Sequence, residues 1–347
     1  MSEDERYDDD KADIVEGEEI LFGLNFHSIR QGAIATEGND EPLPLVEPEE
    51  DELRTRIRIR TQVDELCHYH EDTSSKPLAT QADFVHLFQW ASQQGAVLDS
   101  ILCQTDSFGG RGLFTTKDIQ TGEVIAVLPR SLRWGQSHAC RVLRLPKSTP
   151  DLTALTLLVL QLSRQDHVYA KCLPRREQFT NALLMSPEEQ NAWKQIDESY
   201  YGAMQRVQSI AEGCQGYIRH VLLDNGHEGE TLDNHQSASG PTLLWAIAMV
   251  KSRSHAFGSK RGYWLTPVLD LLNHSPTPNA VLTGGDEGQL LLQALSPIPK
   301  EDEITIDYQV EDDAMMLANY GFSLVHKAPT VEAAPLPLRR LSHLILS

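Results

Sequence analysis

Cysteine is scarce in this sequence and never occurs in a pattern that binds zinc or builds a disulfide framework. The five residues are Cys67, Cys103, Cys140, Cys172 and Cys214, and no CxxC pair is present. An odd number of widely spaced cysteines is typical of buried thiols in a reducing compartment. The sequence therefore predicts no metal site built on cysteine and no disulfide bonds.

Long apolar runs are also lacking. No run approaches the roughly 18 residues of a membrane span, and no stretch near residue 1 resembles a signal peptide. We therefore expect a protein of the cytosol or the nucleus without a membrane partner. Hydrophobic residues still make up 40% of the 347 residues, which is enough for one large domain or two ordinary ones.

Clustered positive charge is confined to "RTRIRIR", residues 54–60, whose alternation of Arg with Ile is equally typical of an edge strand. Direct binding of nucleic acid is therefore not expected. Negative charge is concentrated in residues 1–52, where 18 Asp and Glu against 3 Lys and Arg give −15 of the net −20. Ordering such a segment would bury little apolar surface, so we predict a mostly disordered acidic region over residues 1–80. It is either a solvated extension or a docking segment for a basic partner.

Regular structure is expected from residue 81 onward. A helix that closes near Gly95 precedes short strands separated by glycine-containing turns, and a second set of short strands follows near residues 263–308. Between these β-rich pieces, apolar residues recur at helical spacing over residues of about 140–245. The pattern predicts an α+β fold of short strands and small sheets interrupted by a mostly helical insert.

Three stretches carry groups suited to binding or chemistry. In "SFGGRGLF", residues 107–114, the glycines let the backbone approach a ligand closely. The stretch matches neither a Rossmann fingerprint nor a P-loop, because a strand follows and GK[ST] is absent. Taken alone, it is most often a hairpin turn.

The second stretch is "DLLNH", residues 270–274. A metal site or a metal-dependent hydrolase would use Asp270, His274 and His255, but neither histidine has an HxxxH partner. A serine hydrolase would need a GxSxG elbow, which does not occur. A hydrogen-bonded turn at the end of a strand is the simplest alternative.

The third stretch, residues 300–322, contains a strand that ends at Tyr308 and a later "YGF" at residues 320–322. The tyrosines suit either a core whose hydroxyls reach solvent or an aromatic pocket for a cation.

In this order the stretches resemble the SET domain of protein methyltransferases. The likeness is to the branch typified by the Rubisco large-subunit lysine methyltransferase, in which a helical insert splits the β-structure, and it covers residues 81–325, leaving a short tail at 326–347. The matching motifs are GxG at Gly110, Arg111 and Gly112, SRxF at Ser252 and Arg253, DxxNH at Asp270, Asn273 and His274, the strand-ending Tyr308, and YGF from Tyr320 to Phe322.

The resemblance implies S-adenosylmethionine as methyl donor and a protein lysine as acceptor. A protein histidine as acceptor and a non-catalytic SET-like binding module are the alternatives. Tyr308 is implied as the catalytic residue, and Arg253, Asp270 and Tyr320 are implied to contact the substrate. The implied cofactor-binding residues are Gly109, Gly110, Arg111, Gly112, Arg253, Asn273, His274, Tyr308 and Phe322.

The sequence departs from the family pattern at three places. "EDE", residues 301–303, replaces the usual "GEE", and the segment after Arg253 is one or two residues longer than usual. Only 25 residues follow Phe322, whereas this branch usually continues into a helical domain that holds the protein substrate. We therefore expect target choice to depend on the insert, the acidic region or another chain.

Overall fold

The computed structural model describes residues 50–67, 78–105, 110–223, 243–256, 262–310 and 312–323. All of them belong to one compact unit that spans residues 49–347. Three predicted features lie outside the described residues: the acidic region up to residue 49, Gly109 and the tail at 326–347.

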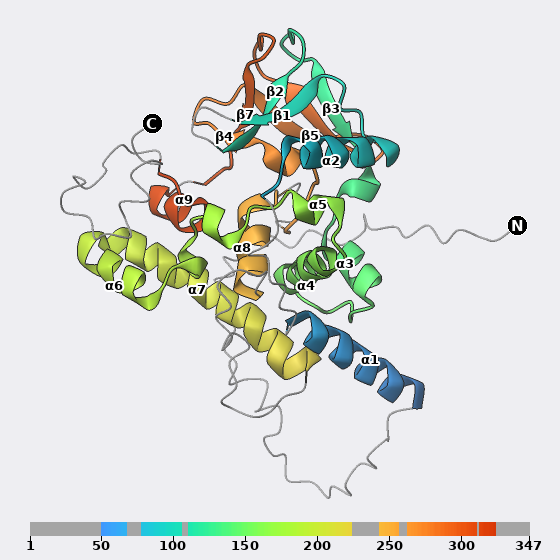
Figure 1. Cartoon of the computed structure of the whole chain (residues 1–347), viewed down its shortest axis with the longest axis vertical. Coiled ribbons are helices and arrows are strands. Elements are labelled where there is room, and N and C mark those ends of the chain that lie inside the picture. The colour runs from blue at the N-terminus through green and yellow to red at the C-terminus, as the bar shows by residue number, and fades with distance from the viewer. Residues whose placement is uncertain are drawn as a thin grey trace, which may run out of the picture. The chain divides into compact units, whose positions relative to one another are not determined.

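A four-stranded sheet combines the first two strands of the chain with two strands from its last third. Its order is β1 (Ile101–Thr105), β2 (Arg111–Thr115), β7 (Glu303–Ile306) and β4 (Asn273–His274). β2 runs antiparallel to both β1 and β7, whereas β4 runs parallel to β7. The sheet therefore brings the glycine-rich stretch, "NH" and the strand before Tyr308 side by side, although they are far apart in the sequence (Figure 1).

A second sheet has the order β3 (Val124–Leu128), β6 (Leu290–Ala294) and β5 (Ala280–Gly284), with all neighbours antiparallel. In β6 the buried residues are Leu290, Leu292 and Ala294, so the strand presents every second side chain to the core. The predicted short strands and small sheets are confirmed.

Helices occupy the chain before, between and after the strands. They are α1 (Glu50–Cys67), α2 (Gln81–Gln93), α3 (Gln136–Leu143), α4 (Asp151–Arg164), α5 (Val168–Lys171), α6 (Pro187–Ile196), α7 (Glu198–Tyr217), α8 (Leu243–Arg253) and α9 (Asp313–Tyr320). Shorter turns are η2 (Arg130–Leu132), η3 (Arg176–Gln178), η4 (Ala182–Leu184), the π-helical η5 (Ile218–Leu222) and η6 (Leu269–Leu271). No helix in the described ranges is long and apolar enough to span a membrane.

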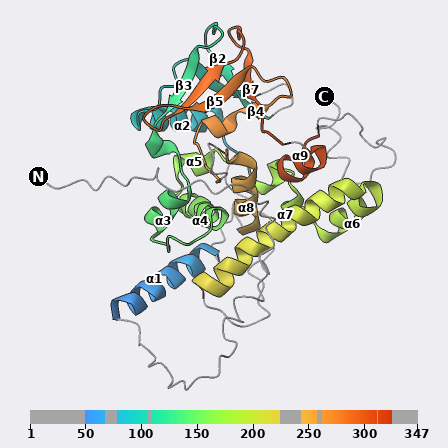
Figure 2. The same ribbon diagram turned by 180° about the vertical axis from the view of Figure 1, so that it is seen from behind.

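The helices between β3 and β4 contribute many buried residues to the core. Nearly every side chain from Leu152 to Leu162 in α4 is buried, and α4 packs against α8, whose residues from Trp245 to Val250 are buried as well. Figure 2 shows α8 between the sheets and the long helix α7. α8 ends at Arg253, whose side chain donates to the backbone of Asp270 just before β4.

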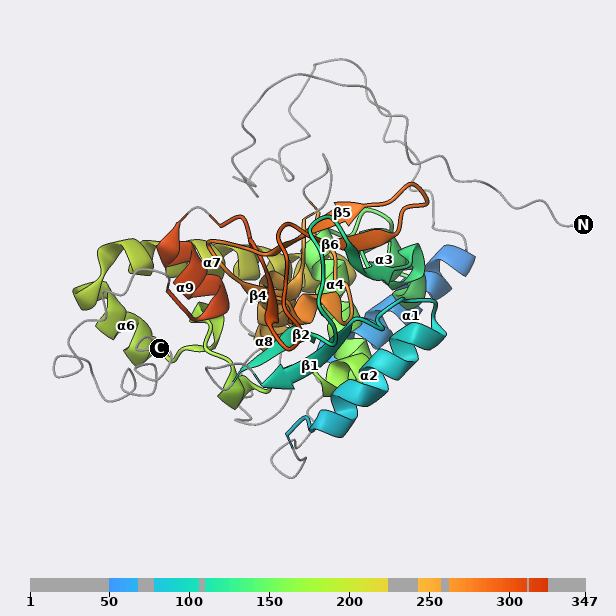
Figure 3. The ribbon, with the colours of Figure 1, turned by 90° about the horizontal axis from the view of Figure 1, so that it is seen from above.

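Local sequence explains where the helices begin. At α2, the Thr80 side chain accepts from the backbone of Asp83, and the Asp83 carboxylate accepts from the backbone of Thr80. Ser186 and Glu189 form the same reciprocal arrangement at α6, where Pro187 takes the first helical position. In Figure 3, α2 lies along β1, and Phe84 and Leu87 are among the residues that it buries.

One expectation is wrong: "RTRIRIR" is not an edge strand but part of helix α1. The residues that α1 buries are Ile59, Val63, Leu66 and Cys67, which recur every three or four positions, and the helix packs against α4. Ile57, the alternate residue that a strand would have buried, is 56% exposed. The buried residues of α1 therefore follow a helical period and not the alternation of a strand. Residues 50–67, which were expected to belong to the disordered acidic region, are helical.

Candidate functional site

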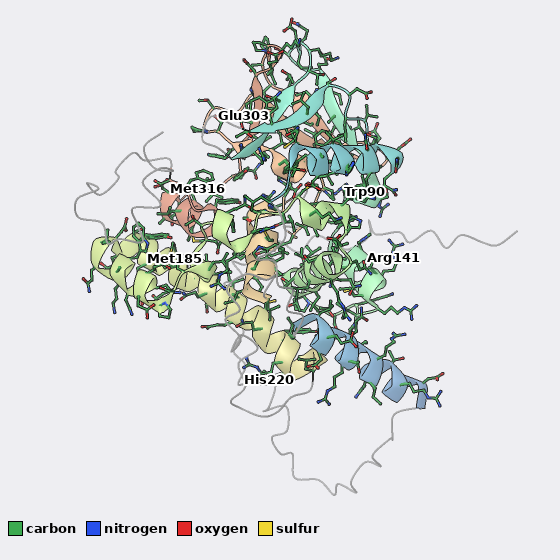
Figure 4. The ribbon with its side chains drawn as sticks, in the orientation of Figure 1. Trp90, Arg141, Met185, His220, Glu303 and Met316 are labelled. Carbon is green, nitrogen blue, oxygen red and sulfur yellow. The ribbon has the colours of Figure 1, made fainter. Side chains whose placement is uncertain are left out.

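The site is built where β2, β7 and β4 run side by side. Asn273 and His274 are paired with Thr305 and Ile306 of β7, and Leu113 of β2 is paired with Ile304. The two motifs "GRG" and "NH" therefore lie on either side of the strand that leads to Tyr308. Figure 4 places Glu303, the first residue of that strand, on this sheet.

The side-chain amide of Asn273 ties the three strands together. Its Nδ2 donates to the carbonyl oxygen of Arg111 at 3.1 Å and to Oε1 of Glu303 at 2.7 Å. A Cβ at Gly112 would approach this Nδ2 to 3.0 Å and would collide with the Glu303 carboxylate. A side chain at position 112 would therefore displace the Glu303 carboxylate from its place beside Asn273.

Arg111 contributes its backbone, because its side chain is directed elsewhere. The guanidinium lies 5.3 Å from the centre of the Phe84 ring and donates to the hydroxyl of Thr105. Gly110, just before β2, is exposed. The glycine-rich stretch thus presents main-chain groups at the start of β2.

Within the described residues, one ring nitrogen of His274 forms a hydrogen bond and the other does not. Its Nδ1 accepts the backbone N–H of Tyr308 at 3.1 Å, so the neutral ring carries its proton on Nε2. Burial lowers the pKa of His274, although the Asp307 carboxylate 3.8 Å away opposes this shift. Among the described residues, the buried Nε2 has no hydrogen-bond partner. It is a donor available to a bound molecule.

Tyr308 lies in a group of four aromatic rings. Its O–H donates to the carbonyl oxygen of Leu272 at 2.7 Å, and its ring centre is 4.7 Å from that of Tyr320 and 5.2 Å from that of His274. Phe322 completes the group, 6.1 Å from Tyr320 and 6.3 Å from His274. Burial raises the pKa of Tyr308 and raises that of Tyr320 to about 12. Both hydroxyls are therefore neutral donors at pH 7.

Arg253 and Asp270 meet next to this group. Nη1 of Arg253 donates to the backbone carbonyl of Asp270 at 3.1 Å and lies 3.6 Å from Oδ2 of its carboxylate. Oδ2 also accepts the O–H of Tyr169 at 2.8 Å. The Asp270 side chain is 1% exposed, and burial raises its pKa, although the charge of Arg253 and the Tyr169 hydrogen bond offset part of the shift. In the described part of the chain, Oδ1 of Asp270 and Nε of Arg253 are buried and have no hydrogen-bond partner.

The "YGF" turn is fixed by the insert. Nδ2 of Asn181 donates to the carbonyl oxygen of Asn319 at 2.6 Å. Gly321 ends α9 with φ 82°, and a Cβ at this position would collide with the backbone carbonyl of Thr180. The segment of residues 180–181 therefore sets the position of Tyr320 and Phe322.

The structure brings most of the residues expected at the site into one region. Gly110, Arg111, Gly112, Asn273, His274 and Tyr308 converge through the four-stranded sheet, whereas Arg253, Asp270, Tyr320 and Phe322 approach from the helical side. Sequence reasoning missed Tyr169 and Glu303, whose side chains form hydrogen bonds with Asp270 and Asn273. Glu303 had a signal, because it lies in the "EDE" stretch that departs from the family pattern. Tyr169 had none, since it stands 101 positions before Asp270.

A metal-dependent hydrolase built on Asp270, His274 and His255 is one of the alternatives for the "DLLNH" stretch. Within the described ranges, no group of three or more His, Cys, Asp and Glu side chains is arranged to hold a metal ion. Burial lowers the pKa of His255 to about 4, and its backbone pairs with Trp264.

Residues 110–309 match the family model of the SET domain, which is more than half of the chain. The chain belongs to the SET domain family, and the resemblance drawn from the motifs is confirmed.

Known proteins similar to this chain differ in what they modify. SET domain-containing protein 4 of Mus musculus is 23% identical over 264 residues, which are 70% of this chain and 58% of that protein. Actin-histidine N-methyltransferase of Mus musculus is 23% identical, with 69% of this chain and 42% of that protein aligned. The chloroplastic Rubisco large-subunit N-methyltransferase of Pisum sativum is 21% identical, with shares of 68% and 50%. The chain therefore spans about half of the length of these relatives.

A solved structure has the same fold. The crystal structure of the SET domain of LSMT bound to lysine and AdoHcy superposes with a TM-score of 0.55 at 19% identity, covering 70% of this chain and 57% of that one. The α+β architecture with a helical insert is thus that of a SET domain.

Proposed function

We propose that the chain transfers a methyl group from S-adenosylmethionine to a side-chain nitrogen of a protein, with lysine as the favoured acceptor. The observation that carries this proposal is the convergence on three neighbouring strands of exposed backbone at Gly110, an orienting amide at Asn273 and a buried, unused donor at His274. Similarity to methyltransferases that act on lysine and on histidine supports the class of reaction.

The residues present fit the cofactor. The main chain of Gly110, Arg111 and Gly112 and the side chains of Asn273 and His274 would hold its polar groups, and the Nε2 proton of His274 would gain the partner that it lacks among the described residues. When bound, S-adenosylmethionine supplies a methyl group on a positively charged sulfur. No metal is needed for a displacement of this kind.

The protein's own task is to orient and desolvate the attacking nitrogen. Holding two reacting atoms in line removes much of the entropic barrier. A lysine must also be neutral to attack, and an apolar, aromatic wall such as that of Tyr308, Tyr320 and Phe322 lowers the pKa of an amine by desolvation. The Tyr308 hydroxyl and the Leu272 carbonyl that it contacts are dipoles suited to stabilising the shifting positive charge.

Lysine is favoured over histidine because this wall is built from aromatic rings. A long, flexible amine can pass between such rings, and the similar LSMT structure contains bound lysine. The similarity to actin-histidine N-methyltransferase, at 23% identity against 21% for the Rubisco enzyme, keeps histidine as the second candidate. Acid hydrolysis of the labelled product distinguishes the two, because methyl-lysine and methyl-histidine separate in amino-acid analysis.

The first experiment measures cofactor binding by the purified full chain. S-adenosylmethionine is titrated by calorimetry into the wild type, into Asn273→Ala and into Asn191→Ala, a matched control on the exposed surface of α6. We expect binding by the wild type and the control and at least tenfold weaker binding by Asn273→Ala. No binding by the wild type would contradict the proposal.

The second experiment measures transfer. The same proteins are incubated with a whole-cell protein extract and S-adenosylmethionine labelled in its methyl group. Label in a protein band, lost in Asn273→Ala and kept in Asn191→Ala, supports an enzyme. Binding of the cofactor without any transfer would instead favour a non-catalytic SET-like module.

A further inference from the structure

Tyr169 is a fully buried tyrosine of the insert that reaches into the site. It is the second residue of α5 and 1% exposed, and its O–H donates to Oδ2 of Asp270 at 2.8 Å. Its position is fixed on two sides. The ring packs edge-on against Trp134 with centres 5.3 Å apart, and the backbone N–H donates to Nδ1 of His167 at 3.2 Å.

We propose that Tyr169 is a positioning residue for the site: its hydroxyl holds Oδ2 of Asp270, so that Oδ1 is left to accept a hydrogen bond from the bound substrate. The part of this inference that concerns the substrate rests on the proposed function. The hydrogen bond between Tyr169 and Asp270 rests on the geometry alone. It assigns to the helical insert a direct part in shaping the site.

Few groups stabilise the charged form of the buried Asp270 carboxylate. The Arg253 guanidinium, on α8, and the Tyr169 hydroxyl, on α5, are the side chains that lower the pKa of Asp270. In the described part of the chain, the other titratable groups that interact with Asp270 are Cys103 of β1, Cys172 after α5 and Tyr308 after β7. Burial raises the pKa of Cys103 to about 11 and that of Cys172 to about 12, so both thiols are neutral at pH 7.

Removing the hydroxyl must therefore make the charged form of Asp270 more costly. The pKa of Asp270 is already raised in the folded protein, so the unfolded chain loses its proton first as the pH increases. Stability consequently decreases as the pH rises from the unfolded value near 4 through the folded value. In Tyr169→Phe the folded pKa is higher still, and the decrease extends further upward in pH.

The test follows thermal unfolding of the full chain from pH 4 to pH 9. We expect the difference in Tm between the wild type and Tyr169→Phe to be small at pH 4 and to grow toward neutral pH. In an Asp270→Asn background the same substitution should produce a difference that does not change with pH. Tyr200→Phe is the matched control, because Tyr200 is equally buried in the insert but its hydroxyl contacts only the sulfur of Met185, at 3.9 Å, among the described residues.

Transfer of labelled methyl to the protein extract supplies the second readout. Because the raised pKa leaves more of Asp270 protonated in the variant, we expect Tyr169→Phe to transfer less methyl than the wild type at low pH and the ratio of the two rates to shrink as the pH rises. A merely structural role would lower transfer by the same factor at every pH.

The outcomes separate this inference from the proposed function. A Tm difference and a rate ratio that stay constant with pH, or a variant that fails to fold even at pH 4 to 5, would overturn the role of Tyr169. A wild type that neither binds nor uses the cofactor would overturn the proposed function, while the Tm measurements would still report on the Tyr169–Asp270 pair.

Discussion

Asn273 and Glu303 form a side-chain hydrogen bond of 2.7 Å between the neighbouring strands β4 and β7. The same Nδ2 donates to the Arg111 carbonyl, so both of its protons are used. If the Asn273 amide were rotated by 180°, its Oδ1 would face the Arg111 carbonyl and the Glu303 carboxylate, which are both acceptors. Glu303 therefore fixes which face of Asn273 is presented to a bound molecule.

Replacing Glu303 should consequently weaken cofactor binding without removing any group assigned to the cofactor. We expect Glu303→Leu to bind S-adenosylmethionine roughly 5- to 30-fold more weakly, which corresponds to about 1–2 kcal/mol for a lost hydrogen bond. Glu303→Gln should bind nearly as the wild type, because its amide oxygen can accept the same bond. Titration calorimetry measures all three, and equal weakening in both variants would show that the charge rather than the hydrogen bond matters.

Tyr308→Phe should separate binding from transfer. The substitution keeps the ring beside His274 and Tyr320 but removes the hydroxyl that donates to Leu272. We expect cofactor affinity to change little and transfer of labelled methyl to decrease on the order of 100-fold, as for the loss of one preorganised dipole at a reacting centre. Full transfer by the variant would refute the catalytic role.

Gly321→Ala should damage both the fold and the site. The residue adopts φ 82°, which costs other residues about 1–2 kcal/mol, and its Cβ would collide with the Thr180 carbonyl. Urea denaturation should show a loss of at least 2 kcal/mol. The matched control is Gly213→Ala in α7, where nothing lies within 4 Å of the added Cβ. It should instead stabilise the helix by about 0.5–1 kcal/mol.

Glu301→Gly should stabilise the chain. Glu301 stands where related sequences usually have glycine in the turn before this strand, and it adopts φ 71°. Its backbone N–H donates to Thr115, a bond that glycine retains. Its carboxylate faces Lys300 in an exposed pair that contributes little. Relief of the backbone strain should add up to about 1 kcal/mol to the free energy of unfolding.

Asp302→Gly, one position further, is the control for this prediction, because Asp302 does not have a positive φ. It should lower the free energy of unfolding through added flexibility of the unfolded chain. Stabilisation by both substitutions, or by neither, would contradict the strain argument.

The sequence alone was sufficient where a motif is short and its order along the chain is informative. "GRG", "NH" and Tyr308 were expected together, and the sheet brings them together. The helical period of α1 was misjudged because Arg and Ile alternate over 54–60, and only its contact with α4 shows which residues are buried. Tyr169 could not be predicted, since its importance comes from a contact over 101 positions. Localisation and a basic partner for the acidic region stay predictions.

The pairing of β2 with β7 also has a consequence for how the protein folds. The hydroxyl of Thr115, which ends β2, donates to the carbonyl of Pro299, 184 positions later. Closing so long a loop is entropically costly and slow, whereas the helices within it form from local contacts and shorten it. We therefore expect the insert to fold first and the pairing of β2, β7 and β4 to follow. A molecule bound across these strands would stabilise the part of the chain that forms last.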